Sequence, residues 1–122
     1  MILIDTSAWV RFFKGLDEAG FVGDKIRDNI AVLHPLVLGE LILGGLSTHN
    51  EALLEALPRM PTHSPEWIYR FIRENSLSGK GIGWVDAAIL CSTSEAKATL
   101  ATFDETLRSC AEAIGVTCLS PV

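Results

Sequence analysis

Short runs of apolar residues alternate with longer segments of helical periodicity along this 122-residue chain. The segments that indicate strands cover residues 2–4, 30–33, 99–102 and 117–119, and residues 59–61 are a shorter candidate. Strands that are buried on both faces lose the in–out alternation of side chains, and helices between them form the crossovers of a parallel sheet. The sequence therefore predicts an α/β fold in which helices cover both faces of a parallel sheet.

The intervening helices are predicted over residues 6–14, 17–29, 36–46, 49–57, 65–75, 84–95 and 104–114. Thr6 or Ser7 is the expected N-cap of the first helix. His34 and Pro35 form a break before the third helix. No linker, repeat or low-complexity stretch divides the sequence, so we expect a single domain over residues 1–122.

Four acidic residues occupy apolar surroundings in which a charge is costly. Asp5 closes the first apolar run, Glu40 and Asp86 interrupt helical segments rich in Leu, Ile and Val, and Asp104 follows the run that ends at Phe103. A carboxylate that is buried alone costs several kcal/mol or gives up its charge. Four such placements in one small chain indicate that a shared ligand holds them, and a divalent cation is the simplest one.

The predicted topology brings these acids to one place. Asp5 and Asp104 lie just beyond the carboxyl ends of strands, which is where open parallel sheets bind ligands. The residues three and four positions away from Glu40 and Asp86 are mostly apolar, so we expect both side chains to follow the buried stripe of their helices. Clustered carboxylate oxygens suit Mg²⁺ or Mn²⁺ rather than Zn²⁺, and such ions activate water for attack on phosphorus.

Each acid also has a purely structural explanation. Asp5 fits an Asx-turn that leaves the strand, and Asp86 fits the favourable position of a carboxylate near a helix N-terminus. Asp104 fits an N-cap, or Thr102 and Glu105 form a capping box there. Helix interiors rarely bury a lone glutamate, so Glu40 has the least convincing structural explanation.

The composition limits the remaining classes. Net charge is −5 and apolar residues make up 48% of the chain, with a mean hydropathy of +0.31, which indicates apolar surface covered by another chain. The acidic balance is not typical of a nucleic-acid-binding protein, although four of the acids belong to the predicted cation site. Cys91, Cys110 and Cys118 lack metal-type spacing and are expected to be free thiols of a cytoplasmic protein. No signal peptide or membrane span is predicted. The three histidines are expected at the surface or in turns.

Four motifs in order resemble those of the PIN-domain ribonucleases. They are Ile-Leu-Ile-Asp-Thr-Ser at residues 2–7, Val-Leu-Gly-Glu-Leu-Ile-Leu-Gly at 37–44, Asp-Ala-Ala-Ile at 86–89 and Leu-Ala-Thr-Phe-Asp at 100–104. Chain length and the position of the first motif are most similar to the VapC-type toxins of VapBC toxin–antitoxin systems.

This resemblance implies a three-layer α/β/α PIN-like domain with a central parallel sheet of about five strands. It also implies Mg²⁺- or Mn²⁺-dependent endonucleolytic cleavage of RNA, a homodimer, and inhibition by a cognate antitoxin whose tail enters the active-site groove. The catalytic, metal-binding positions match Asp5, Glu40, Asp86 and Asp104. Thr6 or Ser7, and Thr102, match polar positions that support the site. Some relatives carry a further acid where this chain has Thr106.

Contacts to RNA are predicted from basic residues at helical spacing. Arg11 and Lys14 lie three apart in the first helix, Arg70 and Arg73 repeat that spacing, and Lys80 stands in the loop beyond. The alternative is that these residues belong to solvated helix faces. The aromatic residues Trp9, Phe12, Phe13 and Trp84 either stack on bases or pack in a core or an interface.

Three other functions share the acidic pocket. A phosphoacceptor signalling domain needs paired acids at the first strand and a lysine after the last one, but Thr6 and Ser7 follow Asp5 and residues 119–122 contain no lysine. A small-molecule phosphatase needs a second aspartate where Ser7 stands. A catalytically silent PIN-like binding module remains as the third alternative, which a cleavage assay distinguishes.

Overall fold

A computed structural model describes residues 1–119 of the chain, so only the last three residues of the expected domain lie outside it. Its centre is a parallel sheet in which β1 (Ile2–Ile4) lies between β2 (Ala31–Val32) and β3 (Thr99–Ala101). Leu3 pairs with Val32 on one side and with Leu100 on the other. Nearly all residues of these strands are buried. The predicted parallel α/β fold is confirmed.

The two outer segments of the expected sheet pair at single positions only. Leu33 forms an isolated parallel bridge with Arg59, and Leu100 forms one with Cys118. The segment at Arg59 stays short because Pro58 and Pro61 flank it, and proline lacks the N–H that would extend the ladder. The expected sheet of about five strands is therefore three strands with a bridged segment on each side.

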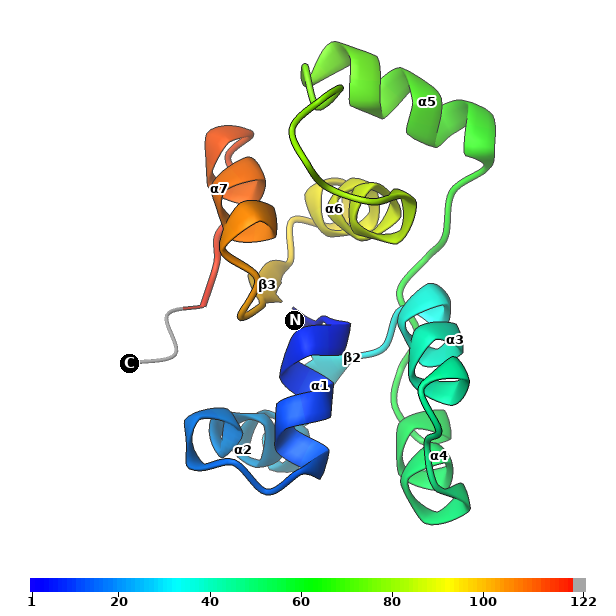
Figure 1. Cartoon of the computed structure of the whole chain (residues 1–122), viewed down its shortest axis with the longest axis vertical. Helices are drawn as coiled ribbons and strands as arrows, with labels where there is room; N and C mark the ends of the chain where they lie inside the picture. Colours follow the sequence, from blue (N-terminus) through cyan, green and yellow to red (C-terminus); the bar gives the residue numbers. More distant parts are fainter. Residues whose placement is uncertain (120–122) are drawn as a thin grey trace.

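Seven α-helices and one 3-10 turn are present among residues 1–119. They are α1 (Thr6–Phe13), η1 (Asp17–Ala19), α2 (Phe21–Arg27), α3 (Pro35–Leu43), α4 (Thr48–Glu55), α5 (Pro65–Glu74), α6 (Trp84–Ala96) and α7 (Glu105–Ala113). Figure 1 shows α6 and α7 on one side of the strands and α1 with α2 on the other. None of these helices is long and apolar enough to cross a membrane.

The predicted helix over residues 17–29 is divided in two. Gly20 separates η1 from α2, and its N–H donates to the Asp17 carbonyl at 3.0 Å, which closes a 3-10 turn. Glycine has low helix propensity, so the continuous helix suggested by periodicity breaks there. The short α2 still contributes to the core, with Val22 fully buried.

The break expected at His34 and Pro35 is the start of α3. His34 is the N-cap, and Pro35 takes the first helical position, where its missing N–H is not needed. The expectation that the histidines lie at the surface or in turns is wrong for His34, which is only 1% exposed. Helix α3 packs Val37 and Leu41 into the core.

Candidate functional site

Asp5 is the most firmly held of the four predicted acids. It follows β1 directly and forms the N-cap of α1, a role that the sequence had assigned to Thr6 or Ser7. Its Oδ1 accepts the Ala8 N–H at 3.0 Å and the Ser7 hydroxyl at 2.7 Å, and its Oδ2 accepts the Thr102 hydroxyl at 2.5 Å. Only 4% of Asp5 is exposed, so its carboxylate has one defined orientation.

Ser7 and Thr102 also hold the connection between β3 and α7. The Ser7 hydroxyl oxygen accepts the Phe103 N–H at 3.0 Å, and the Thr102 hydroxyl oxygen accepts the Asp104 N–H at 3.0 Å. Each hydroxyl donates to Asp5 and accepts from the backbone of this connection. The two hydroxyls therefore fix where the chain carries Asp104 relative to Asp5.

Asp86 is half-buried in the first turn of α6, as predicted. Its Oδ2 accepts the Gly83 N–H at 3.1 Å, so the expected stabilisation of a helix N-terminus is present. Burial raises its pKa, the Gly83 hydrogen bond opposes that rise, and the charges of Asp104 and Glu40 raise it further. Asp86 is therefore close enough to both Asp104 and Glu40 for their negative charges to disfavour its ionisation.

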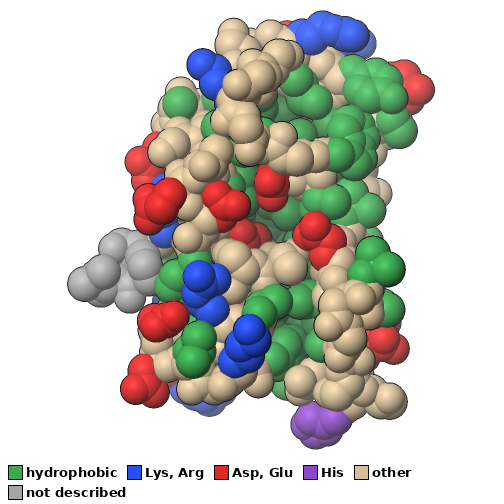
Figure 2. All heavy atoms as spheres, in the orientation of Figure 1, with side chains coloured by type: hydrophobic (Ala, Val, Ile, Leu, Met, Phe, Trp, Pro, Cys, Tyr) green, Lys and Arg blue, Asp and Glu red, His purple; other side chains and the backbone are tan. Residues whose placement is uncertain are grey.

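Asp5 belongs to the same electrostatic group. Burial raises the pKa of Asp5, the hydrogen bonds from Thr102, Ser7 and Ala8 oppose the rise, and the charge of Asp86 adds to it. Asp86 thus interacts with each of the other three predicted acids. The structure brings these carboxylates into one field, and Figure 2 shows Asp and Glu side chains gathered across the middle of this face.

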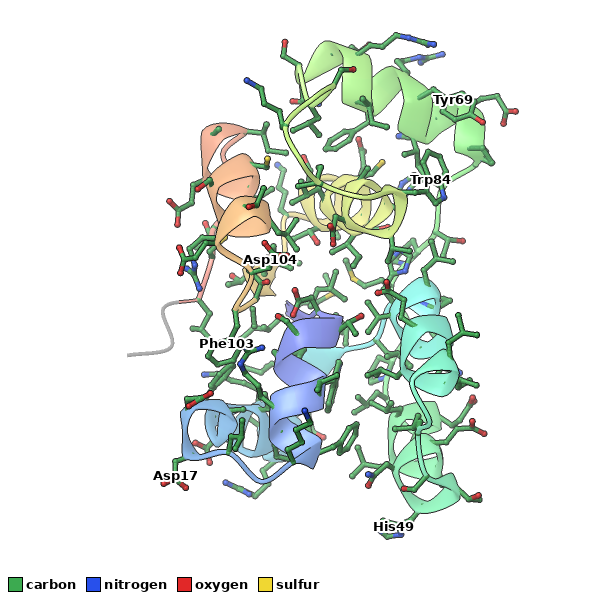
Figure 3. All side chains as sticks on the ribbon, viewed as in Figure 1. Asp17, His49, Tyr69, Trp84, Phe103 and Asp104 are labelled. Carbon is green, nitrogen blue, oxygen red and sulfur yellow. The ribbon has the colours of Figure 1, made fainter. Side chains whose placement is uncertain are left out.

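Asp104 is exposed and is the N-cap of α7. Its Oδ1 accepts the Leu107 N–H at 3.0 Å, which confirms the N-cap alternative over a capping box of Thr102 and Glu105. Figure 3 shows Asp104 at the start of α7, beside the connection from β3. Its charge still raises the pKa of Asp86, so the capping role and membership of the acidic group coexist.

The expectation that Glu40 follows the buried stripe of its helix is wrong, because its side chain is exposed. At 3.6 residues per turn, Glu40 lies about 60° around α3 from Val37, at the margin of the buried stripe. There it faces α1, and its Oε1 accepts the Thr6 hydroxyl at 2.6 Å. Thr6 and Ser7 therefore orient different acids, Glu40 and Asp5 respectively.

The chemistry of this donor set fits a hard divalent cation. All four predicted ligands are carboxylates, and a bound cation would relieve the repulsion that raises the pKa of Asp86. As they stand, no three His, Cys, Asp or Glu side chains within residues 1–119 are close enough to hold one ion. Binding of one cation by all four acids would require side-chain movement, for which the exposed Glu40 and Asp104 have the most freedom.

Of the predicted RNA-binding residues, Arg11 and Lys14 lie beside the acidic group. Arg11 donates to the Ser7 carbonyl at 3.1 Å, and its guanidinium carbon lies 4.7 Å from the centre of the Phe103 ring. Lys14 lines a groove together with Glu40. Figure 2 shows basic side chains over α1 next to the acidic band.

The other three basic candidates are farther from the acids. Arg70 lies 6.0 Å over the Trp67 ring on α5, and Arg73 follows in the last turn of that helix. Lys80 lines a separate groove beside α7, together with Thr106. In Figure 2 the basic side chains over α5 occupy the edge of the face, apart from the acidic band.

The aromatic residues divide between core and surface. Trp9 is fully buried, with its ring centre 5.5 Å from that of Phe13 and 6.0 Å from that of Phe12, so it belongs to the core. Trp84 is 44% exposed and packs against Tyr69, with ring centres 5.7 Å apart. Figure 3 shows Tyr69 and Trp84 adjoining where α5 faces α6.

Sequence reasoning missed an apolar groove between α1, α3 and α4. The groove has a volume of about 440 Å³, and its polar lining residues are Thr6, Lys14, Glu40, Ser47 and Asn50. Its apolar lining residues are Val10, Phe13, Leu41 and Leu46. The apolar residues of α1 and α3 are visible in the sequence. The open groove between these helices depends on tertiary packing, which the sequence pattern does not give.

Comparison with known proteins gives matches over nearly the whole chain. The family model of the PIN domain matches residues 2–113. Ribonuclease VapC32 of Mycobacterium tuberculosis is 34% identical over 116 residues, which cover 92% of each chain. Two solved structures share the fold: FitAcB from Neisseria gonorrhoeae (TM-score 0.67, 21% identity, 99% and 98% of the chains covered) and PAE2754 from Pyrobaculum aerophilum (TM-score 0.64, 15% identity, 96% and 87% covered).

Proposed function

The chain belongs to the PIN-domain family, and on that premise we propose that it is a metal-dependent endoribonuclease, the toxin of a toxin–antitoxin pair. Asp86 carries this proposal, because its half-buried carboxyl is coupled to the charges of Asp5, Glu40 and Asp104 at one edge of the sheet. The name of the relative, a ribonuclease with 34% identity, supports RNA as the substrate. Family membership also removes the ground for a phosphoacceptor or a small-molecule phosphatase.

In the proposed mechanism, Asp5, Glu40, Asp86 and Asp104 would hold Mg²⁺ or Mn²⁺, and a cation held there would supply Lewis acidity for the attack of water on the scissile phosphate. Ser7 and Thr102 keep the Asp5 carboxylate in one orientation, since both hydroxyls donate to it. Thr6 donates to Glu40 in the metal-free protein. The two contacts to Asp5 reduce the reorganisation that cation binding requires.

Substrate binding is proposed to begin at Arg11 and Lys14. Their positive charges flank the acids on α1, where they would attract the phosphates next to the scissile bond. Arg70 and Arg73 on α5, and Lys80 in the loop beyond, are proposed as contacts to more distant phosphates, because the basic side chains over α5 occupy the edge of the same face (Figure 2). The closeness of positive charge to the carboxylates offsets the acidic balance of the whole chain.

The proposed antitoxin occupies the groove between α1, α3 and α4. Its apolar residues suit one face of an amphipathic segment, and the Glu40 carboxylate in its lining suits a basic side chain. A segment bound there would reach the acidic group and compete with both cation and RNA. This supports inhibition by occupation of the site.

A homodimer is proposed from the distribution of exposed apolar side chains. Within residues 1–119, and apart from Met1 and Leu16, the large exposed apolar residues lie on α3, α5 and the start of α6; they are Leu36, Ile42, Leu43, Trp67, Tyr69 and Trp84. Such a concentration marks a surface that another chain covers. A cytoplasmic location is proposed from the free thiols of Cys91, Cys110 and Cys118.

The test compares RNA cleavage by Asp5→Asn and Asp86→Asn with that by Asp17→Asn, an exposed acid in η1 that lies far from the acidic band (Figure 3). Each substitution removes one charge at nearly constant volume. We expect the first two variants to lose at least about 100-fold in kcat/KM, or about 2.7 kcal/mol, while the third stays active. Full metal-dependent cleavage by both site variants would overturn the proposal, and an inactive wild-type protein would favour the binding module.

A further inference from the structure

A buried polar contact joins the helix that carries Glu40 to the helix that carries Asp86. His34, at the N-terminus of α3, places its Nε2 3.2 Å from the hydroxyl of Ser92 on α6. Both residues are only 1% exposed. The Ser92 hydroxyl also donates to the Pro61 carbonyl at 2.9 Å. The contact therefore lies in the interior, apart from the acids themselves.

The hydrogen bonds define the tautomer of His34. Its Nδ1 accepts the Leu36 N–H at 3.1 Å, so this nitrogen carries no proton in the capped helix. In the neutral ring the proton then lies on Nε2 and is donated to Ser92. Burial, with a smaller contribution from His63, lowers the pKa of His34 to about 4, which keeps the ring neutral near pH 7.

The contact lies six residues from each acid, before Glu40 on α3 and after Asp86 on α6. Glu40 follows His34 by six residues, and Ser92 follows Asp86 by six residues. At 1.5 Å per residue, each carboxylate is about 9 Å along its helix from the contact. A rotation of either helix by about 10° around this point would move its acid by about 1.6 Å, which is large compared with the precision that a cation site needs.

We propose that His34 is a positioning residue: in its neutral Nε2–H form it joins α3 to α6 through Ser92 and so sets the separation of Glu40 and Asp86. The inference rests on the proposed function, because it assumes that these two acids share a cation. Glu40 needs such support from a distance, since its own side chain is exposed and has only the Thr6 hydroxyl as a hydrogen-bond donor within residues 1–119.

Two substitutions of His34 separate its two contacts. Asn places an amide oxygen near the position of Nδ1, so His34→Asn keeps the cap of α3 and loses the bond to Ser92. Gln places an amide nitrogen near the position of Nε2, so His34→Gln keeps the bond to Ser92 and loses the cap. Ser92→Ala removes the same bond from the other helix, together with the bond from Ser92 to the Pro61 carbonyl.

Thr93→Val is the matched control for Ser92→Ala. Thr93 is the next residue of α6, is fully buried, and donates its hydroxyl to the Ile89 carbonyl of the same helix at 2.7 Å. Thr93→Val therefore removes a buried hydroxyl but leaves the hydrogen bond between His34 and Ser92 intact. A purely structural role for Ser92 would make the two variants behave alike.

The experiment measures Mn²⁺ binding to the metal-free proteins by calorimetry, together with kcat/KM for RNA cleavage and the midpoint of thermal unfolding. We expect the Kd for Mn²⁺ to rise about 10-fold or more in His34→Asn and Ser92→Ala, as for other residues that orient metal ligands. The double variant should be no weaker than the weaker single one, because both changes remove the same bond. His34→Gln should restore Mn²⁺ affinity to within about twofold of wild type despite a lower midpoint.

Unchanged Mn²⁺ affinity in folded His34→Asn and Ser92→Ala would overturn the inference, as would an equal loss in Thr93→Val. Ser92→Cys, with similar volume and a weaker acceptor, replaces Ser92→Ala if that variant does not fold. Failure of the proposed function itself is distinguishable, because the wild-type protein would then neither bind Mn²⁺ nor cleave RNA.

Discussion

The two halves of the acidic site are held in different ways. Asp5 is buried and accepts three hydrogen bonds, from Ala8, Ser7 and Thr102. Glu40 is exposed and accepts one, from Thr6. The first acid is positioned by contacts to its own oxygens, whereas the second depends on where its helix lies. We therefore propose that the site has a preformed half at Asp5 and a half at Glu40 that would close on a bound cation.

The largest effect on stability is expected at the preformed half of the site, from Thr102→Val. This change removes the hydroxyl that donates to Asp5 and accepts from Asp104, so a charged and a neutral hydrogen bond are lost together. We expect the free energy of unfolding to fall by about 3–4 kcal/mol and kcat/KM for RNA to fall by about 10- to 100-fold.

Thr99→Val provides the control for Thr102→Val, because it makes the same substitution at the start of β3, three residues before Thr102 and away from Asp5. Denaturant unfolding and a cleavage assay measure both effects. If Thr102→Val behaved like Thr99→Val, the hydroxyl would not hold Asp5, and the preformed half would not differ from the other.

The sequence predicted the preformed half better than the other one. Asp5 was found because an acid at the end of a buried strand conflicts with local hydrophobicity, and that signal lies within a few residues. The exposure of Glu40 was missed because helical periodicity gives an angle around the helix but not the neighbour at that angle.

The same limit applies elsewhere in the fold. The three central strands were predicted from local apolar runs, whereas the outer segments beside Arg59 and Cys118 pair at one position each, which depends on how the chain returns to the sheet edge. The burial of His34 was missed because its partner, Ser92, is far away in the sequence. No local pattern around His34 indicates that contact.

The next largest effect on stability is a pH dependence that arises from His34, the residue proposed to position α3 and Glu40. Its folded-state pKa of about 4 lies below the ordinary value of 6.5, so the unfolded chain takes up a proton first as the pH falls. The protein should therefore lose up to about 3 kcal/mol of stability between pH 6.5 and pH 4, and no further loss from this group is expected below pH 4.

His34→Gln should flatten that pH dependence, because it removes the titrating ring. His49→Gln, at an exposed position, should leave the dependence unchanged. Urea unfolding at several pH values between 4 and 7 measures the slopes. Parallel slopes for His34→Gln and wild type would contradict the role of the buried neutral ring.

A smaller effect of opposite sign is expected from Asp86. Its folded-state pKa is raised, first by burial and then by Asp104 and Glu40, so ionisation of Asp86 opposes folding of the metal-free protein. Stability linked to this group falls as the pH rises through its folded pKa and is recovered as the pH falls towards 3.8. Asp86→Asn should stabilise the metal-free protein at pH 7 by no more than about 1 kcal/mol, because solvent screens a half-exposed carboxyl.

With a cation bound, the wild type should be more stable than Asp86→Asn, which reverses the order expected for the metal-free proteins. Saturating Mn²⁺, at about 100 times its Kd, should add about 2.7 kcal/mol to the stability of the wild type and much less to that of Asp86→Asn. Thermal unfolding with and without Mn²⁺ measures both terms. If Asp86→Asn gained as much stability from Mn²⁺ as the wild type, Asp86 would not be a ligand.

The smallest effect on stability is expected from Thr6→Val, at the half of the site that closes on the ligand. The hydrogen bond from Thr6 to Glu40 is exposed, so water replaces it at little cost, and the free energy of unfolding should change by less than about 0.5 kcal/mol. Glu40 would move when a cation binds, so its contact with Thr6 would not be retained unchanged. We therefore expect the Kd for Mn²⁺ to change by less than about threefold. If Thr6→Val lowered the free energy of unfolding as much as Thr102→Val does, Thr6 would hold Glu40 as firmly as Thr102 holds Asp5. Both halves of the site would then be preformed.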